Sequence, residues 1–202
     1  MDWSSAEGRM CMDMQSAIVI YIVLTVTGRF LSQRQRKNNR RKQLSQWRNI
    51  VKDYTAIVAV IATAFAMGLA LLEAALREDT VLPITSIIIG TVIVTGGWVV
   101  AWFANRKIGT NWSPIIEKTN RQELVTSGIY SLVRHPLYFS GFCILIGTNI
   151  YFCSKWAWIG TGIALITILF RIPIEEKKLK ERFGDEYIAY MHKTKALIPW
   201  VF

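Results

Sequence analysis

The sequence predicts an all-α, polytopic integral membrane protein with five transmembrane helices. Hydrophobic residues make up 52% of its 202 residues, and most of them fall in five long runs with few charges. An apolar run of about 20 residues is long enough to cross a bilayer as a helix. The strands of a membrane barrel would be shorter and would alternate polar and apolar positions, which these runs do not do.

The second and third runs have the length that a transmembrane helix requires, and Glu73 is the only charge in the second. The first run is short for a span unless Arg29 extends its side chain toward the headgroups. The fourth run begins at Pro136, and the fifth follows it after a short polar turn. In chain order the predicted helices cover residues 16–31, 54–76, 82–104, 136–154 and 156–174.

The distribution of Lys and Arg predicts the orientation of these helices. The formal net charge is +10, and most of the basic residues lie in segments 32–53, 105–134 and 175–202, which share one side of the membrane. The positive-inside rule makes that side cytoplasmic, so the N-terminus would lie outside or in a lumen and the C-terminus in the cytoplasm. The membrane would be the plasma membrane of a prokaryote or the endoplasmic reticulum of a eukaryote.

The basic segment 32–53 could also bind nucleic acid. Its position between two predicted spans favours a topology signal that contacts anionic lipid instead. The N-terminal residues are acidic and no small-residue cleavage site follows the first run, so we expect the first helix to be retained. The three cysteines, Cys11, Cys143 and Cys153, show no metal-binding spacing, and we expect the last two to be small apolar residues of the fourth helix.

The chain divides into two parts in this interpretation. Residues 1–104 would hold three transmembrane helices and the basic connector, and residues 105–202 would carry the chemistry, including a helical hairpin over 136–174. The short loop 77–81 predicts that the second and third helices form an antiparallel pair.

The C-terminal tail predicts an amphipathic helix on the membrane surface or over a site. Its apolar residues recur at helical spacing, with a break at Gly184; they are Leu179, Phe183, Tyr187 and Tyr190.

The segment VRHPLY places Arg134, His135, Pro136 and Tyr138 at the start of the fourth predicted helix. Proline suits the first helical position, whose N–H has no partner within the helix. The N–H groups of Leu137 and Tyr138 would then be free and, with the helix dipole, would favour an anion such as a carboxylate. In the alternative interpretation, His135 only caps the helix and Arg134 anchors it at the membrane interface.

The segment FRIPIEE lies near the cytoplasmic end of the fifth predicted helix. Arg171 and Glu175 are four residues apart, so both project from one helix face, and Pro173 between them predicts a kink. Ionisable residues at membrane depth are candidates for function, although a mutually neutralising pair explains the same residues equally well.

A third segment, ELVTSGIY, offers backbone groups from Glu123 to Val125, a turn at Gly128 and the aromatic face of Tyr130. Together the three segments suit a ligand with an anionic, a cationic and a flat apolar part. S-adenosyl-L-methionine has all three, together with a sulfonium group that aromatic faces can stabilise. On these residues alone it is one candidate among others.

The combination of QELVTSGIYSLVRHPLY with RIPIEE and FGDEYIAY resembles the isoprenylcysteine carboxyl methyltransferase family, in particular its compact prokaryotic members. The resemblance covers roughly residues 105–199 and implies a cofactor, S-adenosyl-L-methionine, enclosed by the cytoplasmic loop, the hairpin and the tail, with S-adenosyl-L-homocysteine as product. It implies Arg171 as the substrate contact. The cofactor-binding residues that it implies are Gln122, Glu123, Leu124 and Val125 at the adenine end, and Tyr130, His135, Pro136, Leu137, Tyr138 and Glu175.

The implied reaction displaces the methyl group from the sulfonium onto a lipophilic acceptor held in the membrane. A carboxylate is ionised near pH 7 and needs no general base, which favours an isoprenylcysteine-like carboxylate over an amine. The alternatives are a phospholipid N-methyltransferase, a small-thiol S-methyltransferase and, outside the enzymes, a membrane scaffold or binding protein. The presence of Tyr130, His135, Tyr138, Arg171 and Glu175 together argues against the scaffold.

Overall fold

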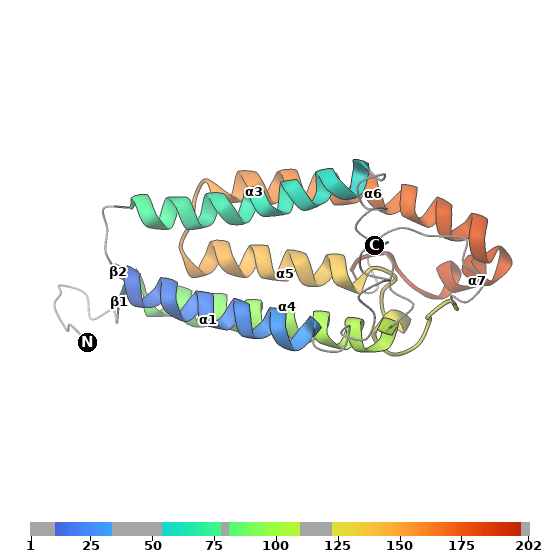
Figure 1. Cartoon of the computed structure of the whole chain (residues 1–202), viewed down its shortest axis with the longest axis horizontal. Coiled ribbons are helices and arrows are strands. Elements are labelled where there is room, and N and C mark those ends of the chain that lie inside the picture. Colours follow the sequence, from blue (N-terminus) through green and yellow to red (C-terminus); the bar gives the residue numbers. More distant parts are fainter. Residues whose placement is uncertain (1–10, 34–53, 78–80, 110–122, 199–202) are drawn as a thin grey trace, which may run out of the picture.

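The computed structural model describes residues 11–33, 54–77, 81–109 and 123–198 (Figure 1). These residues form a bundle of long helices with two short strands at one end. The helices are α1 (Met14–Gln33), α3 (Tyr54–Leu76), α4 (Ile84–Ile108), α5 (Pro136–Tyr151), α6 (Ala157–Phe183) and α7 (Asp185–Lys193), with a 3-10 helix, η3, at Gly128–Ser131. The strands are β1 (Cys11–Asp13) and β2 (Val81–Pro83), which pair antiparallel.

Figure 1 shows α5 between two pairs of helices, α1 with α4 on one side and α3 with α6 on the other. The long helices alternate in direction along the chain, so the bundle has two distinct ends. We call the end with β1 and β2 the strand end, and the end with α7 the α7 end. The starts of α3 and α5 and the ends of α1, α4 and α6 all lie toward the α7 end.

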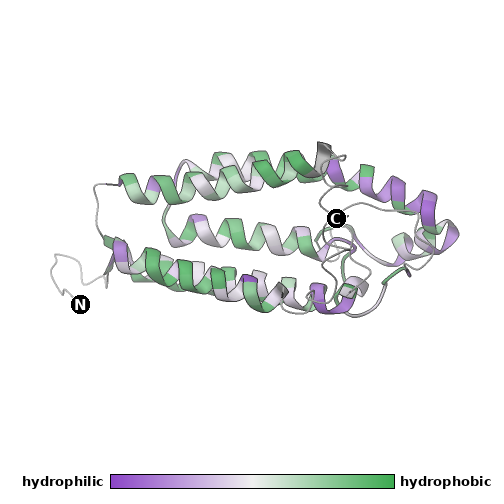
Figure 2. Cartoon of the chain, in the orientation of Figure 1, coloured by the Kyte–Doolittle hydropathy of each residue, from purple (hydrophilic) through white to green (hydrophobic). Residues whose placement is uncertain are grey.

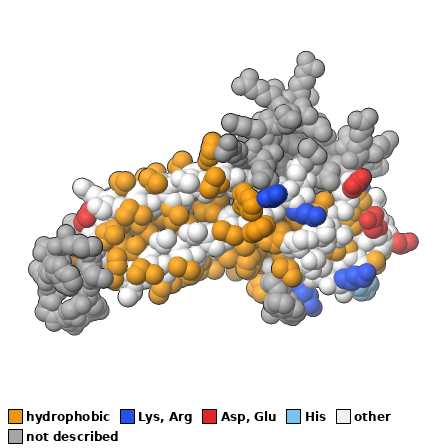
Figure 3. Space-filling view, turned by 90° about the horizontal axis from the view of Figure 1, so that it is seen from below, with side chains coloured by type: hydrophobic (Ala, Val, Ile, Leu, Met, Phe, Trp, Pro, Cys, Tyr) orange, Lys and Arg blue, Asp and Glu red, His pale blue; other side chains and the backbone are white. Residues whose placement is uncertain are grey.

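Among the described residues, four helices are long and apolar enough to cross a membrane. They are Met14–Ser32, Ile57–Leu76, Ile84–Ile108 and Ala157–Phe183. Much of their apolar surface faces outward, with large side chains such as Val60, Ile61 and Val92 more than half exposed. Figures 2 and 3 show these hydrophobic residues along the length of the bundle, as in a protein whose sides contact lipid. The chain is therefore an integral membrane protein.

The fourth predicted span corresponds to the shorter helix α5, which has 16 residues. At 1.5 Å per residue it is about 24 Å long, less than the ~30 Å of a hydrocarbon core. A complete crossing by α5 therefore stays a prediction. The sequence-based boundary at residue 154 was too late: α5 ends at Tyr151, and Cys153 lies in the following turn rather than in the helix.

Small residues let α3 and α6 pack close together. Ala62 and Ala66 of α3 are buried in one cluster with Ala164 of α6. A Cβ added at Gly160 of α6 would lie 2.7 Å from the Cα of Ala66. In lipid the hydrophobic effect does not drive helices together, because the lipid tails are as apolar as the side chains. Close van der Waals contact of this kind therefore favours helix association.

Helices α4 and α5 approach each other in the same way. A Cβ at Gly90 of α4 would lie 2.6 Å from the Cα of Tyr151, and one at Gly147 of α5 would lie 2.9 Å from the backbone nitrogen of Val94. Because neither glycine has a side chain, the two helix backbones can pack directly. The prediction that the second and third helices pair is corrected by these contacts, because α3 packs mainly on α6, and α4 mainly on α5.

Hydrogen bonds between buried polar side chains connect the helices across the bundle. The hydroxyl groups of Tyr21 and Thr148 lie 2.5 Å apart, and the Tyr151 hydroxyl donates to the Ala17 carbonyl at 2.9 Å. The Asn149 amide donates to the Thr161 hydroxyl at 2.9 Å. These bonds join α1, α5 and α6, and they satisfy groups that would otherwise be unpaired in an apolar interior.

At the strand end, Glu73 of α3 and Arg77, which directly follows α3, hold the turn between α5 and α6. The Glu73 carboxylate accepts the backbone N–H groups of Lys155 and Trp156 at 2.8 and 2.9 Å, and also the Ser154 hydroxyl. The Arg77 guanidinium donates to the carbonyls of Phe152 and Cys153 at 3.0 and 2.8 Å. The negative charge thus meets the positive end of the α6 dipole, and the positive charge meets the negative end of α5.

Candidate functional site

The polar residues that the sequence analysis singled out gather at the α7 end (Figure 1), where η3, the start of α5, the last turns of α6 and α7 meet. Helix α6 has 27 residues and is about 40 Å long, so it extends beyond a ~30 Å hydrocarbon core. Glu175 and Glu176 lie about 20 residues from the start of α6. The charged residues of this helix therefore lie near the membrane boundary.

The residues before α5 position its first turn. His135 is the N-cap residue and Pro136 occupies the first helical position, as predicted. The Tyr138 N–H, however, donates to the His135 carbonyl at 3.1 Å, and the Phe139 N–H donates to the same oxygen at 3.2 Å. The prediction that the Tyr138 N–H is free for an anion is therefore wrong. Because 3-10-type bonding tightens this turn, the Leu137 N–H is the one member of the predicted anion site that these bonds do not use.

The Tyr138 hydroxyl lies between Arg171 and Glu175. It donates to Glu175 Oε2 at 2.6 Å and accepts from Arg171 Nε at 2.7 Å, while Arg171 Nε and Glu175 Oε2 are 3.8 Å apart. The sequence alone leaves open whether Arg171 and Glu175 form a simple pair on one helix face. They do share that face, but the phenol of α5 joins them, so the cluster connects α5 to α6.

Burial separates the roles of these two charged residues. Arg171 is 7% exposed, whereas the Glu175 side chain keeps 27% of its surface accessible. Pro173 between them does not end the helix, which continues to Phe183. Glu175 can therefore still accept hydrogen bonds from a ligand, while Arg171 lies inside the cluster.

Glu176 is a member of the site that the sequence analysis missed. Its Oε1 accepts from Arg134 Nε at 2.7 Å and lies 3.3 Å from His135 Nε2. The residue is 8% exposed. The two glutamates are consecutive on α6 and project about 100° apart around the helix, so Glu175 reaches Tyr138 while Glu176 reaches the residues before α5. The repeated glutamate in RIPIEE was the available signal.

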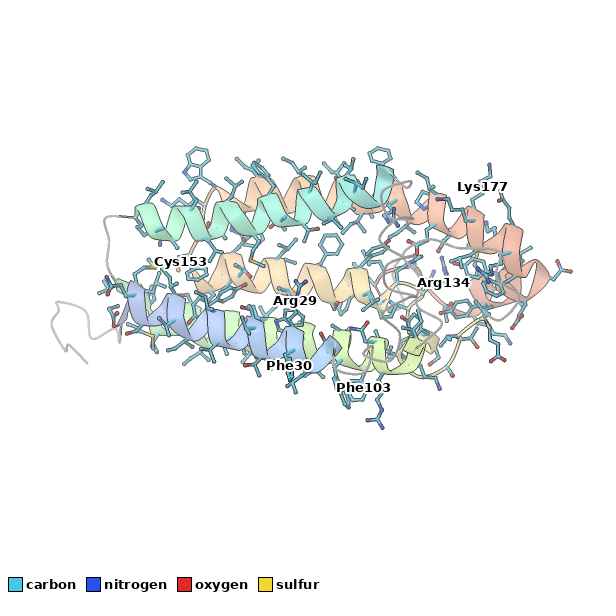
Figure 4. The ribbon with its side chains drawn as sticks, viewed as in Figure 1. Arg29, Phe30, Phe103, Arg134, Cys153 and Lys177 are labelled. Atoms are coloured by element: carbon cyan, nitrogen blue, oxygen red, sulfur yellow. The ribbon has the colours of Figure 1, made fainter. Side chains whose placement is uncertain are left out.

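Arg134, for which the sequence left membrane anchoring open, is bound to other parts of the chain through its side chain. Besides Glu176, its guanidinium donates to the carbonyls of Met191, at 3.4 Å, and Thr194. Figure 4 shows Arg134 within the α7 end, among segments from α6 and α7. The arginine thus holds the C-terminal part of the chain against the start of α5.

The backbone supports the same attachment. The Arg134 N–H donates to the Lys195 carbonyl and the His135 N–H to the Ala196 carbonyl, both at 2.9 Å. Val133 and Lys195 form an isolated parallel bridge. The residues that precede α5 are therefore fixed through both main chain and side chains before the helix begins.

Helix α7 contacts η3 through Tyr190, whose ring also packs edge-on against that of Tyr187. The Tyr190 hydroxyl donates to the Tyr130 carbonyl at 2.5 Å, and Tyr130 itself is buried. Burial raises the pKa of Tyr190 to about 12. Burial, followed by the negative charge of Glu176, also raises the pKa of Tyr187, so both phenols remain protonated at ordinary pH.

The remaining predicted residues have fewer contacts with the cluster. Pro136 is fully buried and Leu137 is half-buried, as expected for the first turn of α5. Glu123 is exposed, Leu124 and Val125 are half-buried, and Gln122 lies outside the described residues. The adenine contact that the resemblance implies for these four residues stays a prediction.

The groups in the cluster suit the chemistry of S-adenosylmethionine. A partly exposed carboxylate at Glu175 fits an ammonium group, and the aromatic rings of Tyr138 and His135 stack at 5.4 Å with an interplanar angle of 19°, presenting faces that suit a sulfonium. The buried guanidinium of Arg171 fits the carboxylate of a second ligand, the methyl acceptor. The same end of one bundle thus offers groups of both charges and apolar surface.

Comparisons with known proteins identify the family of this chain. The model of the isoprenylcysteine carboxyl methyltransferase (ICMT) family matches residues 88–181. A probable protein-S-isoprenylcysteine O-methyltransferase of Oryza sativa subsp. indica is 32% identical over 146 residues, which cover 70% of this chain and 76% of the rice protein. The protein-S-isoprenylcysteine O-methyltransferase of Xenopus laevis is 34% identical over 117 residues, covering 56% of this chain and 41% of the frog protein.

The chain spans less than half the length of the Xenopus protein and of its Arabidopsis thaliana relative, of which 44% is covered. Among solved structures, that of a eukaryotic intramembrane Ras methyltransferase ICMT is 20% identical, with a TM-score of 0.48 and coverage of 93% of this chain and 68% of that one. The assignment rests on the sequence matches, above all on the rice protein, because the structural similarity is below 0.5. The chain belongs to the isoprenylcysteine carboxyl methyltransferase family.

Proposed function

We propose that this protein is a methyltransferase that uses S-adenosyl-L-methionine to methylate a lipophilic acceptor held in the membrane. The reaction best supported is carboxyl methylation of an isoprenylcysteine-like molecule, the reaction after which the relatives are named. The observation that carries the proposal is the cluster of Arg171, Tyr138 and Glu175 at the end of a candidate membrane span. A cationic group at this depth can meet an acceptor whose lipid part stays in the bilayer.

The residues that would hold the cofactor are Glu175, at its ammonium group, and the aromatic side chains of Tyr130, His135 and Tyr138. When bound, S-adenosylmethionine supplies an electrophilic methyl group, so that one C–S bond breaks while a C–O bond forms and the sulfur keeps the electron pair. Residues 105–202 would thus contain the catalytic part of the chain, with α7 closing its cytoplasmic side.

Arg171 would orient the carboxylate of the acceptor. A guanidinium group has five N–H donors in a planar fork, so contact with Tyr138 through Nε is compatible with a contact to a carboxylate through the terminal nitrogens. No proton has to move, because a carboxylate with a pKa of about 3.5–4 is ionised near pH 7. Catalysis then rests on positioning and on the exclusion of water.

The orientation proposed from the sequence is supported by the charge distribution at the two ends. Figure 3 shows Lys and Arg side chains gathered toward the α7 end, and the described basic residues there include Arg106, Lys107, Lys177 and Lys180. The described basic residues at the strand end are Arg77 and Lys155, and Arg77 is bound to backbone carbonyls. By the positive-inside rule the α7 end would face the cytoplasm, with α5 as the fourth of five crossings.

Binding of the product, S-adenosylhomocysteine, tests the cofactor site directly. We expect calorimetry in detergent to show binding by the wild-type protein and a loss of about 10- to 100-fold in affinity in Glu175→Gln, the worth of a hydrogen bond to a charged group. Glu181→Gln makes the same chemical change at an exposed position of α6 and should bind like the wild type. The proposal fails if the folded wild-type protein does not bind, or if the two variants weaken binding equally.

A further inference from the structure

The two consecutive glutamates of α6 each hold one ring of the segment that starts α5. Glu175 accepts from the Tyr138 hydroxyl at 2.6 Å, and Glu176 lies 3.3 Å from Nε2 of His135. The two rings are stacked on each other. Glu175 is already implied in cofactor binding, whereas nothing in the resemblance or in the comparisons gives Glu176 a role.

The direction of the hydrogen bond between Glu176 and His135 follows from the third partner. Arg134 Nε donates to the same oxygen, Oε1, at 2.7 Å. A guanidinium group keeps its protons in proteins and can only donate, and an ionised carboxylate can only accept. The oxygen that Arg134 and His135 share is therefore the acceptor for both, and the hydrogen between Glu176 and His135 belongs to Nε2.

His135 has little freedom to choose another arrangement. The residue is 7% exposed, its backbone N–H donates to the Ala196 carbonyl, and its ring is stacked on that of Tyr138. Glu176 is held equally firmly, because Arg134 is itself bound to the carbonyls of Met191 and Thr194. The C-terminal part of the chain thus fixes the arginine, the arginine fixes the carboxylate, and the carboxylate faces the ring.

We propose that Glu176 is a positioning residue that keeps the neutral ring of His135 protonated on Nε2, which leaves Nδ1 as its hydrogen-bond acceptor. In a neutral imidazole one nitrogen donates and the other accepts, so fixing the first also fixes the second. Toward the cofactor, an extension that rests on the proposed function, His135 would then accept from a donor such as an ammonium or hydroxyl group. It would not donate to a carboxylate.

The sequence makes this tautomer measurable, because the chain has only two histidines, His135 and the exposed His192. With nitrogen-15-labelled histidine, the nuclear magnetic resonance spectrum contains two sets of ring-nitrogen signals. The set that remains in His192→Gln belongs to His135. The neutral ring is the form that persists at the high-pH end of a titration of the same sample. We expect wild-type His135 to carry its hydrogen on Nε2 alone, while His192 shows the average of a solvent-exposed ring.

In Glu176→Gln, the side-chain amide can accept from or donate to the ring, so we expect His135 to show a mixture of both tautomers. Glu175→Gln leaves the Nε2 contact in place and should keep the wild-type tautomer. A wild-type ring protonated on Nδ1 overturns the proposal even if the variant does not fold. An Nε2-protonated ring that Glu176→Gln leaves unchanged overturns it as well, because Glu176 would then be purely structural.

The claim about the tautomer and the claim about ligand binding are tested separately by measuring the tautomer and the affinity for S-adenosylhomocysteine on the same proteins. We expect Glu176→Gln to bind S-adenosylhomocysteine about twofold more weakly for an even mixture of tautomers, because only the Nε2-protonated ring can accept from the ligand. A wild-type protein with the expected tautomer but no binding contradicts the proposed function and leaves the role of Glu176 toward His135 standing. Unchanged binding in a Glu176→Gln protein with mixed tautomers contradicts the extension to the cofactor.

Discussion

Replacing Gly90 by alanine tests how closely α4 and α5 pack. The added Cβ would lie 2.6 Å from both Cα and Cβ of Tyr151 and 2.7 Å from its backbone nitrogen. These atoms cannot move away by a side-chain rotation, so one helix has to shift. Overpacking of this kind costs about 1–3 kcal/mol, and replacement of a helical glycine by alanine offsets about 0.5–1 kcal/mol of it.

Gly96→Ala is the matched control on the same helix, because a Cβ there meets nothing within 4 Å. Both variants gain the same helix propensity, so the difference between their free energies of unfolding isolates the packing penalty, about 1–3 kcal/mol. Denaturant unfolding in mixed micelles, followed through the fluorescence of the 8 tryptophans, measures it. Equal stability of the two variants would refute the close contact of α4 with α5.

The same substitution should affect activity beyond its effect on stability. Tyr151 ends α5, and His135 and Tyr138 lie at its other end. A displacement of α5 by about 1 Å would carry these two rings out of position, and misplacements of this size can lower rates about 100-fold. We therefore expect folded Gly90→Ala to retain only a small part of the wild-type methyl transfer, and Gly96→Ala to retain nearly all.

Three further predictions concern single contacts. Arg171→Ala should keep the affinity for S-adenosylhomocysteine and lose turnover, as measured by calorimetry and methyl transfer; equal loss of both would make Arg171 purely structural. Tyr190→Phe should lower the free energy of unfolding by about 1–3 kcal/mol, because it removes the hydroxyl that donates to the Tyr130 carbonyl. Tyr187→Phe should be neutral or stabilising, since among the described residues the Tyr187 hydroxyl has no hydrogen-bond partner. Similar losses of stability in both variants would contradict this difference. Since the pKa of Tyr190 is raised to about 12, stability in chemical unfolding should fall as pH rises from about 10, where an unfolded tyrosine ionises, to about 12, and this part of the fall should be absent in Tyr190→Phe.

The sequence predicted the membrane helices well because lipid imposes a simple rule on them. A backbone in hydrocarbon must satisfy its own hydrogen bonds and show apolar side chains, and the second predicted span, 54–76, matches α3 at both ends. The end of α6 was predicted nine residues too early, because the change from apolar to charged residues after Ile174 marks where the helix leaves the membrane. The helix itself continues to Phe183 and is stopped by Gly184, which has a φ of +53°.

The strands and the pairing of helices were not predictable in the same way. Strands β1 and β2 have three residues each and form only by pairing with each other across the length of α1 and α3. A short loop indicates that α3 and α4 run in opposite directions, but it does not determine which neighbour each prefers. The positions of glycine and alanine decide that, and they act only when two particular helices meet.

The site was predicted where its signal is local and missed where it is not. The spacing of Arg171 and Glu175 correctly indicated a shared helix face. No local pattern shows that the Tyr138 hydroxyl lies between them, or that Arg134 meets Glu176 across 42 positions of the chain. An arginine beside a membrane span has a sufficient explanation in interfacial anchoring, so only the folded arrangement reveals its contact with Glu176.

Methyl transfer into a defined lipophilic acceptor tests the central claim most directly. The purified protein in lipid nanodiscs is given S-adenosylmethionine labelled in its methyl group, with an N-acetylated S-prenylcysteine, a phosphatidylethanolamine or a small thiol. We predict label in the prenylcysteine that alkali releases as volatile methanol, as expected for a methyl ester, and none in Arg171→Ala. Alkali-stable label in the phospholipid or the thiol, or no transfer by a protein that binds S-adenosylhomocysteine, would contradict carboxyl methylation.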